Sequence, residues 1–393
     1  MNYQFKRAFV IVLDSLGIGN AKDADKYDDL NSNTLKHIDD TIPLKIPHLR
    51  SLGIDRICSI SKIDTPLDHA YALAMNEASL GKDTLTGHYE IMGLLVTKPF
   101  KTFTETGFPK ELIDLLEEKW NRKIIGNCAA SGTKIIQDLG EEQLKTHAAI
   151  VYTSSDSVLQ IAAHEEVIPL QELYRMCEIA REITKDEKYK IGRIIARPFI
   201  GTNASNFKRT SNRHDYALKP FAPTMLNHLK DACYDVIGIG KIADIFDNEG
   251  LTQSFRIKNN QDGCIKTLEM MKKDFNGLCF VNLVDFDMEY GHRRNPVGYG
   301  QAIEDFDTYL GQMKQLLNED DILMICADHG NDPTYKGTDH TRERVPLLIY
   351  SKAFKENGIL PEVFSFATVS STLADIFHVK KTDLGESIIK QLK

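Results

Sequence analysis

The chain has 393 residues, of which 42% are hydrophobic and 26% are charged. A chain of this length exceeds one simple hydrophobic core and favours two domains. The net charge of −8 argues against nucleic-acid binding driven by overall charge, although a local basic pocket for a small anion remains compatible with it. No apolar run approaches the roughly 20 residues that cross a bilayer, which argues against a membrane protein.

The N-terminal segment does not have the pattern of a secretory signal. Its apolar run ends at Asp14 after about six residues, which is too short for a signal core. Seven cysteines without a C-x-x-C pair are typical of buried thiols in a reducing compartment. We therefore expect a cytoplasmic protein, and no obligate protein partner is evident from the sequence.

Residues 9–13 (FVIVL) form a continuous apolar and β-branched run, which predicts a central parallel strand. Asp14 follows directly, so we expect it at the carboxyl end of a strand, where ligands collect in open parallel sheets. A helix N-cap is the alternative role for this aspartate. Gly17 and Gly19 do not begin a dinucleotide loop, because Lys22 occupies the position of the third glycine.

Residues 81–93 (GKDTLTGHYEIMG) are dense in glycine, hydroxyl and charged residues, and they fit neither a simple helix nor a simple strand pattern. A threonine attacks poorly until a metal or a base lowers the pKa of its hydroxyl. Thr84, flanked by charge, is the candidate nucleophile, and Thr86 is its rival. The structural alternative is a hydroxyl that caps a turn or a helix.

Residues 100–219 are predicted to form an inserted α/β domain between the two parts of a core, 1–99 and 220–393. The insert contains expected helices at 109–120 and 169–185 and expected strands at 148–153 and 192–201. Two prolines in 212–224 are typical of a return linker. The insert also carries several arginines, for which a solvated basic face is the alternative to anion binding: Arg193, Arg197, Arg209 and Arg213.

After the insert, strand-like and helix-like segments alternate again. Residues 235–240 are expected to form a strand that ends at Lys241, but GIGK lacks the spacing of a P-loop. Residues 278–287 (LCFVNLVDFD) are expected to form another buried strand. This strand would end in acids, with Asp287 followed five residues later by His292.

The last acidic loop follows, along the chain, an expected helix at 303–317 and an expected strand at 322–326. Asp328 and His329 follow that strand, and a glycine-rich loop can return Asp339 and His340 to the same edge. Carboxylates and imidazoles together suit divalent metals, whereas a solvated polar loop is the alternative. Expected strand ends thus supply three carboxylates and three imidazoles, enough for two divalent ions: Asp14, Asp287, His292, Asp328, His329 and His340.

These residues carry a resemblance to a known family. The motifs VLDSLGIG, GKDTLTGH and ADHGNDP…GTDHTRE, with NLVDFD…GHRR and YTSSDSVLQIAAHEE, resemble those of the phosphopentomutases in the alkaline phosphatase superfamily, and the likeness covers nearly the whole chain. The resemblance implies an α/β fold with an alkaline-phosphatase-like core, whose central, mostly parallel sheet is flanked by helices, plus an inserted α/β cap. It also implies two Mn²⁺ ions, a phosphothreonine at Thr84, and a sugar bisphosphate such as glucose 1,6-bisphosphate as activator.

The implied substrates are small-molecule sugar phosphates: ribose 1-phosphate and ribose 5-phosphate would be interconverted, as would the 2-deoxyribose pair, in nucleoside salvage. Asp14, Asp328 and His329 would hold one ion, and Asp287, His292 and His340 the other, with Thr84 between them. The positions that match substrate contacts of the family are Ser154, Asp156, Arg193, Ile195, Arg209 and Lys241.

Three other functions fit parts of the pattern. A metal-dependent phosphatase or phosphodiesterase needs only water as the acceptor. A cofactor-independent phosphoglycerate mutase has a serine where this chain has Thr84. A non-catalytic metal or sugar-phosphate sensor would leave the poised threonine unused.

Overall fold

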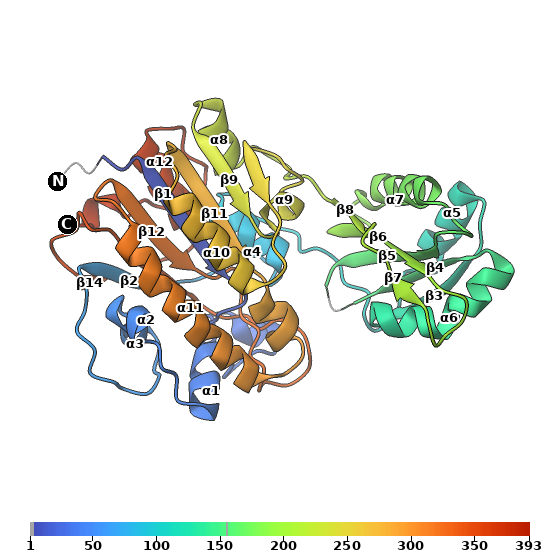
Figure 1. Cartoon of the computed structure of the whole chain (residues 1–393), viewed down its shortest axis with the longest axis horizontal. Coiled ribbons are helices and arrows are strands. Elements are labelled where there is room, and N and C mark those ends of the chain that lie inside the picture. Colours follow the sequence, from blue (N-terminus) through green and yellow to red (C-terminus); the bar gives the residue numbers. More distant parts are fainter. Residues whose placement is uncertain (1–3, 155) are drawn as a thin grey trace. The chain divides into compact units, whose positions relative to one another are not determined.

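The computed structural model describes residues 4–154 and 156–393. The chain divides into two compact units, the core (Met1–Pro99 with Pro220–Lys393) and the cap (Phe100–Lys219). Each unit has its own sheet flanked by helices (Figure 1). No helix in the described ranges is long and apolar enough to cross a membrane.

The core is built on a mostly parallel sheet. Within the described residues it has eight strands, in the order β10 (Gln253–Phe255), β9 (Asp235–Ile239), β11 (Gly277–Leu283), β1 (Arg7–Leu13), β12 (Asp321–Cys326), β13 (Val345–Tyr350), β2 (Ala70–Met75) and β14 (Gly358–Ile359). Strand β13 is antiparallel to both β12 and β2. Every residue of β1, β11 and β12 is buried, as expected for strands with both faces covered. The predicted mixed α/β class with a mostly parallel sheet is confirmed.

The register of the central strands sets the position of the residues that follow them. Leu13 of β1 pairs with Leu283 of β11, and Val12 pairs with Cys326 of β12. The three strands therefore end at nearly the same level. Residues that follow them emerge at one edge of the sheet.

Helices cover both faces of the core sheet, and the core also has short 3-10 and π segments (Figure 1). The longest helix, α11, begins before the predicted 303–317, because Pro296 opens it and the Asn295 side chain accepts from the Gly298 amide at 2.9 Å. The core helices are α1 (Thr34–Thr41), α2 (Pro47–Ser51), α3 (Ile54–Ile57), α4 (Thr84–Ile91), α8 (Met225–Asp231), α9 (Ile242–Ile245), α10 (Asn260–Met271), α11 (Pro296–Leu316) and α12 (Thr368–Phe377). The short segments are η1 (Ala24–Tyr27), η2 (Phe286–Gly291) and η3 (Ile389–Gln391).

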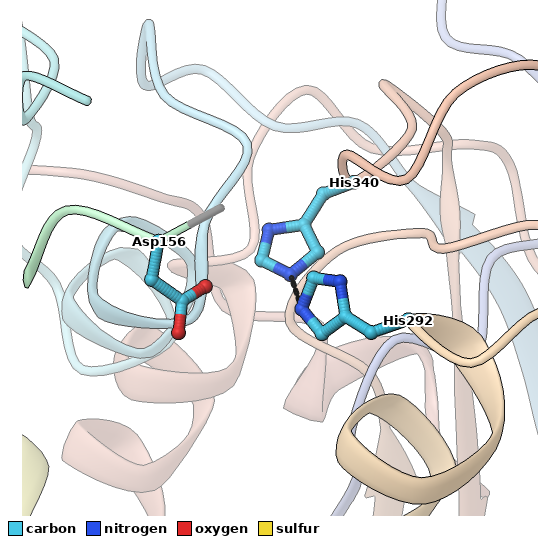
Figure 2. Close-up of side chains that lie close together, drawn as sticks. All are labelled: Asp156, His292 and His340. Atoms are coloured by element: carbon cyan, nitrogen blue, oxygen red, sulfur yellow. Dashed lines mark hydrogen bonds between the residues drawn. The ribbon is translucent and has the colours of Figure 1, made fainter. Parts of the chain in front are cut away.

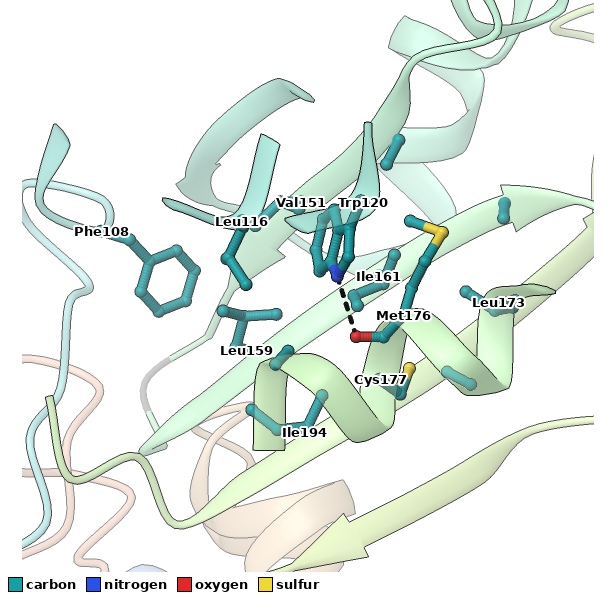
Figure 3. Close-up of a cluster of buried hydrophobic side chains, with 14 of the residues drawn as sticks. Phe108, Leu116, Trp120, Val151, Leu159, Ile161, Leu173, Met176, Cys177 and Ile194 are labelled. Atoms are coloured by element: carbon teal, nitrogen blue, oxygen red, sulfur yellow. Dashed lines mark hydrogen bonds between the residues drawn. The ribbon is translucent and has the colours of Figure 1, made fainter. Parts of the chain in front are cut away.

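The cap has a mixed sheet of its own. Its strands are β3 (Ile124–Ala129), β4 (Ala149–Thr153), β5 (Val158–His164), β6 (Arg193–Ile200) and β7 (Lys208–Arg209), and β8 (His214–Ala217) also pairs with β6. Helices α5 (Lys110–Trp120) and α7 (Leu170–Thr184) cover one face, and α6 (Gly132–Thr146) covers the other. In the larger hydrophobic cluster, Trp120 donates its indole hydrogen to the Met176 carbonyl at 3.0 Å (Figure 3). That bond satisfies the one polar atom of a buried indole.

The core closes around the point where the cap is inserted. The backbone amide of Met225, at the start of α8, donates to the carbonyl of Met92 at 3.0 Å. Met92 follows α4, so this bond joins the segment before the insert to the segment after it. The core unit is therefore continuous in space although it is split in sequence.

Candidate active site

The first group of site residues follows strands β1 and β12. Asp14 and Asp328 are buried beyond the ends of these strands, and their carboxylates lie with His329 in a group whose ligand atoms are within 4.8 Å of one another. The Ser15 amide donates to Asp328 Oδ1 at 3.0 Å and so fixes that carboxylate. These three side chains therefore have the spacing of ligands to one metal ion.

A second group shares His329 with the first. Asp287, His329 and His340 place their ligand atoms within 4.8 Å of one another. His292 lies beside them, with its Nε2 3.1 Å from Asp287 Oδ2 and 3.1 Å from His340 Nε2. Figure 2 shows the imidazoles of His292 and His340 facing each other from separate loops. The structure thus brings all the predicted metal ligands into one place.

One local prediction at this site is wrong. Strand β11 ends at Leu283, and residues 286–291 form the π-helical turn η2, so Asp287 does not lie on a strand as expected from the run 278–287. The turn places Asp287 and His292 at its two ends, and the His292 amide donates to the Asp287 carbonyl at 2.9 Å. This geometry brings both side chains back over the sheet edge.

The structure distinguishes the two candidate threonines. Residues 84–91 form helix α4, a helix that the sequence pattern did not reveal. Asp83 is the N-cap residue of this helix. It accepts hydrogen bonds from the Thr86 amide at 3.1 Å and from the Thr86 hydroxyl at 2.6 Å, so the Thr86 hydroxyl is already used at the start of the helix. Thr84 is the first residue of the helix, and its Oγ1 lies 3.2 Å from His329 Nε2. Thr84, and not Thr86, therefore presents its hydroxyl to the metal-type ligands.

Helix α4 packs tightly against the end of β12. A methyl group at Gly87 would lie 2.0 Å from the carbonyl oxygen of Asp328, so only glycine allows this approach. One residue further, the fully buried His88 has its Nδ1 2.9 Å from the Thr84 carbonyl and 3.0 Å from Asp328 Oδ2. Thr84 and the candidate metal ligand Asp328 thus both contact the same turn of helix.

The buried carboxyl groups of the site are close together, so a bound cation would stabilise their charged forms. Burial raises the pKa of Asp14, and the nearby charge of Asp328 raises it further. Burial also acts to raise the pKa of Asp287, but His292 and His340 outweigh it and hold the pKa well below its ordinary value. Asp14 Oδ1 lies 3.4 Å from His329 Nε2, and Asp328 Oδ2 lies 3.0 Å from His88 Nδ1, so both oxygens face imidazoles. Buried oxygen and nitrogen donors without a thiolate fit divalent cations of the Mn²⁺ or Zn²⁺ type.

Two asparagines that are not among the residues predicted from the sequence support these ligands. Asn282 Nδ2 donates to Asp14 Oδ2 at 2.8 Å, and Asn331 Nδ2 donates to Asp287 Oδ1 at 2.7 Å. Asn282 interrupts the otherwise apolar run of β11, and a polar residue inside a buried strand was the signal available in the sequence.

The predicted substrate contacts lie in different places. In the cap, Asp156 Oδ2 is 3.1 Å from Arg193 Nη2, at the start of β6, and Ile195 follows on the same strand. The carbonyl of Ser154 accepts from the Thr104 hydroxyl at 2.9 Å. Arg209 lies on β7, among the residues of a separate cap pocket. Lys241 belongs to the core, where it precedes α9.

Comparison with known proteins places the chain in a family. Residues 6–381 match the family described as the Metalloenzyme superfamily. The chain is 54% identical over 395 residues to the Phosphopentomutase of Clostridium perfringens, with 99% of each chain covered. Among solved structures, a Pyrococcus horikoshii protein has a TM-score of 0.50 at 14% identity, covering 96% of this chain and 98% of that one. A Leishmania mexicana phosphoglycerate mutase has a TM-score of 0.48 at 12% identity, covering 98% and 97%.

The match over residues 6–381 and the buried carboxylate and imidazole groups define the class: the chain is a member of the metalloenzyme superfamily. The likeness to the Pyrococcus horikoshii structure shows a shared fold and nothing about function. With 54% identity over its whole length, the chain belongs to the phosphopentomutase family and is an enzyme of the mutase type. The resemblance recognised in the sequence motifs is confirmed.

Proposed function

We propose that the enzyme interconverts ribose 1-phosphate and ribose 5-phosphate, and the corresponding 2-deoxyribose phosphates, by phosphoryl transfer through Thr84. The observation that carries the proposal is the 3.2 Å separation of Thr84 Oγ1 from His329 Nε2, a residue common to both metal-type groups. The name of the Clostridium perfringens relative supports the substrate class. A cytoplasmic location and a role in nucleoside salvage belong to the same proposal.

The residues present fit two divalent ions, which we take to be Mn²⁺. One ion would be held by Asp14, Asp328 and His329, and the other by Asp287, His292 and His340. When bound, such ions lower the pKa of a nearby hydroxyl and neutralise charge on a phosphoryl group in transfer.

The chain itself prepares Thr84 for attack. As the first residue of α4, Thr84 stands at the positive end of the helix dipole, where negative charge on its oxygen or on a phosphate is stabilised. Asp83, the N-cap residue of α4, fixes where the helix begins, and the His88 imidazole contacts the Thr84 carbonyl. These contacts position the hydroxyl before any substrate is bound, which removes part of the entropic barrier.

We assign substrate selection to a set of contacts that lies mainly in the cap. A sugar phosphate presents one phosphate for transfer and a second end that must be recognised separately, a role suited to guanidinium groups. Transfer between the two ends is proposed to pass through a sugar bisphosphate, with glucose 1,6-bisphosphate or a similar compound phosphorylating Thr84 initially. The residues proposed to contact the substrate are Ser154, Asp156, Arg193, Ile195, Arg209 and Lys241.

Mass spectrometry of the purified enzyme, after incubation with glucose 1,6-bisphosphate and Mn²⁺, tests the proposal directly. We expect a phosphate on the peptide that contains Thr84 and two Mn²⁺ per chain by elemental analysis. A phosphate on another residue, or one ion per chain with full activity, would overturn it.

The product distribution separates the proposal from hydrolysis on the same core. With ribose 5-phosphate as substrate, a mutase forms ribose 1-phosphate, whereas a phosphatase releases inorganic phosphate. Labelled phosphate on ribose 5-phosphate, mixed with unlabelled deoxyribose 5-phosphate, should move to the other sugar. Label that stays on its original sugar would exclude the bisphosphate route.

A further inference from the structure

The cap contains a cationic pocket on the face of its sheet that α6 covers. The cavity has a volume of about 470 Å³, and its lining includes Thr133 of α6 together with Arg197, Lys208, Arg209 and Arg213. No carboxylate is among the lining residues. The pocket therefore collects positive charge from strand β6, strand β7 and the loop that follows them.

The charges in this pocket are only partly neutralised. Arg213 pairs with Asp215 at 2.6 Å, while Arg197 directs its Nε to the neutral Gln160 side chain at 3.0 Å. Within the described residues, Arg197 and Arg209 form no ion pair with a carboxylate. Burial, with the charges of Arg213 and Arg209 nearby, lowers the pKa of Arg197 to about 10. Cations crowded in this way are stabilised by a bound anion.

An unused hydrogen-bond donor lies beside the pocket, at the start of α6. The Tyr152 side chain is fully buried, and its hydroxyl has no hydrogen-bond partner within the described residues. A methyl group at Gly132, the first residue of α6, would lie 2.7 Å from Tyr152 Oη and 3.1 Å from Arg209 Nη1. Buried hydroxyls rarely remain without a partner, so the space at Gly132 is suited to an acceptor atom.

The start of α6 supplies further donors. The helix runs over 15 residues from Gly132, and the side chain of its N-cap Ser131 accepts from the Lys134 amide at 3.3 Å. The first amides of a helix have no acceptor within the helix, and together with the dipole they favour an anion. Guanidinium groups, a phenol and helix amides are all donors, and within the described residues the Tyr152 hydroxyl has no acceptor.

We infer that this pocket binds a phosphate group, as inorganic phosphate or as the phosphate of a sugar ester, between Arg197, Arg209, Tyr152 and the start of α6. A phosphate dianion offers several acceptor oxygens and the charge that paired guanidinium groups match. The inference concerns the cap alone and does not depend on phosphoryl transfer to Thr84. Arg209 lines this pocket, whereas Asp156 and Arg193, which pair with each other at 3.1 Å, are not among its lining residues.

Calorimetry with inorganic phosphate tests the pocket in the full-length enzyme, in the presence of Mn²⁺ and again with a chelator. We expect phosphate binding that persists with the chelator, because the pocket contains no metal ligand group. Arg197→Ala should weaken it about 10- to 100-fold through loss of charge-assisted bonds. Gly132→Ala should weaken it similarly by filling the space next to Tyr152 Oη while every charge is kept.

Matched controls distinguish phosphate binding in this pocket from nonspecific attraction of phosphate to cap arginines and from loss of folding. Arg175→Ala removes a cap arginine that pairs with Glu172 at 2.8 Å outside the pocket, so phosphate binding should not change. Trp120, the single tryptophan, lies in the cap core, and its fluorescence reports whether each variant is folded. If Arg197→Ala unfolds the cap, Gly132→Ala and Arg209→Gln decide the question.

The outcomes also distinguish the source of the phosphate. Tighter binding of ribose 5-phosphate or glucose 1,6-bisphosphate than of inorganic phosphate, lost in Gly132→Ala, would identify a sugar ester, and equal binding would identify free phosphate. Binding that disappears with the chelator, or that is unchanged in both Arg197→Ala and Gly132→Ala, would overturn the inference. Thr84→Ala should leave this binding intact, so failure of the pocket and failure of the proposed reaction are separate results.

Discussion

Asn282 donates a 2.8 Å hydrogen bond from its side-chain amide to Asp14 Oδ2, across the neighbouring strands β11 and β1. Both side chains are buried beneath the sheet edge. The bond orients the carboxylate, and its other oxygen, Oδ1, lies 3.4 Å from His329 Nε2. A residue of a central strand thus sets the direction in which a metal-type ligand points.

Replacing Asn282 by alanine is expected to weaken metal binding about 10- to 100-fold, which is typical of lost support behind a metal ligand. Titration of the metal-free enzyme with Mn²⁺, followed by calorimetry, measures this. Asn76→Ala is the matched control, because Asn76 is also a buried core asparagine but bonds Glu362 at 2.6 Å, away from the site. Equal losses in the two variants would mean that Asn282 acts on folding.

Thr84→Ala should abolish interconversion of the ribose phosphates while metal content stays at the wild-type value. The reason is chemical: the variant keeps every candidate metal ligand and loses the hydroxyl that we propose to attack the phosphate. Thr84→Ser keeps a hydroxyl and should retain part of the activity. The assay is formation of ribose 5-phosphate from ribose 1-phosphate, with elemental analysis of the same samples, and full activity of Thr84→Ala would contradict the assignment.

Gly87→Ala should reduce activity by displacing α4 from the end of β12, since the added methyl would lie 2.0 Å from the Asp328 carbonyl oxygen. Overpacking of this kind commonly costs about 1–3 kcal/mol of stability. Thermal unfolding and kcat are the measurements. Gly358→Ala serves as the control, because its nearest neighbour, in Tyr71, would be 3.3 Å away. A wild-type kcat in Gly87→Ala would show that the helix can shift without moving Thr84.

Arg193→Ala is expected to weaken use of sugar phosphates by about one to two orders of magnitude, the effect of one lost charge-assisted contact of roughly 1.5–3 kcal/mol. A generic aryl phosphate, which lacks the sugar, should be affected less. Comparing kcat/KM for both substrates measures the selectivity. Equal losses for both would place the effect on the metal site or on folding.

The stability of the cap should fall in acid through Asp215. Burial acts to raise the pKa of this carboxyl, but the Arg213 guanidinium outweighs it and holds the pKa below its ordinary value of 3.8. A carboxyl with a depressed pKa stabilises the fold above the pKa of the unfolded chain, and this stabilisation is lost as the pH falls through the lower, folded value. Wild type should therefore exceed Asp215→Asn in stability at pH 6, and the difference should vanish toward pH values below 3.8.

Urea unfolding at several pH values tests this prediction. The fluorescence of Trp120, which lies in the hydrophobic core of the cap, follows the unfolding. Asp138→Asn is the control, because Asp138 pairs with Lys134 on the exposed surface of α6 and an exposed pair contributes little. If the stability difference between wild type and Asp215→Asn did not depend on pH, the carboxylate of Asp215 would have no stabilising ion pair.

The sequence predicts best those site residues that directly follow a continuous buried strand. Runs such as 9–13 and 322–326 identify central strands, and the polar residues directly after them, Asp14 and Asp328, are then placed by the geometry of parallel sheets. The candidate nucleophile was found from its charged and glycine-rich neighbours. In each case the signal is local in the sequence.

What escaped prediction depends on long-range packing. Every residue of α4 after Thr84 is buried, so the helix lacks the polar face that gives a helical period, and its glycine is explained only by the Asp328 carbonyl that it contacts. The convergence of Arg197 and Arg209 follows from the pairing of β7 with the far end of β6, which no local pattern reports. Tyr152 resembles an ordinary strand residue, and only the structure shows that its hydroxyl has no partner within the described residues.

The position of β1 in the core sheet has a consequence for synthesis of the chain. β1 is made before the other strands of the core sheet, and its neighbours β11 and β12 come from the last third of the given sequence, so it emerges from the ribosome with two apolar faces and no partner strand. The cap, by contrast, is a continuous segment and can fold as soon as it is complete. During translation, a finished cap would therefore be attached to an unfinished core, whose exposed first strand is the part most in need of a chaperone.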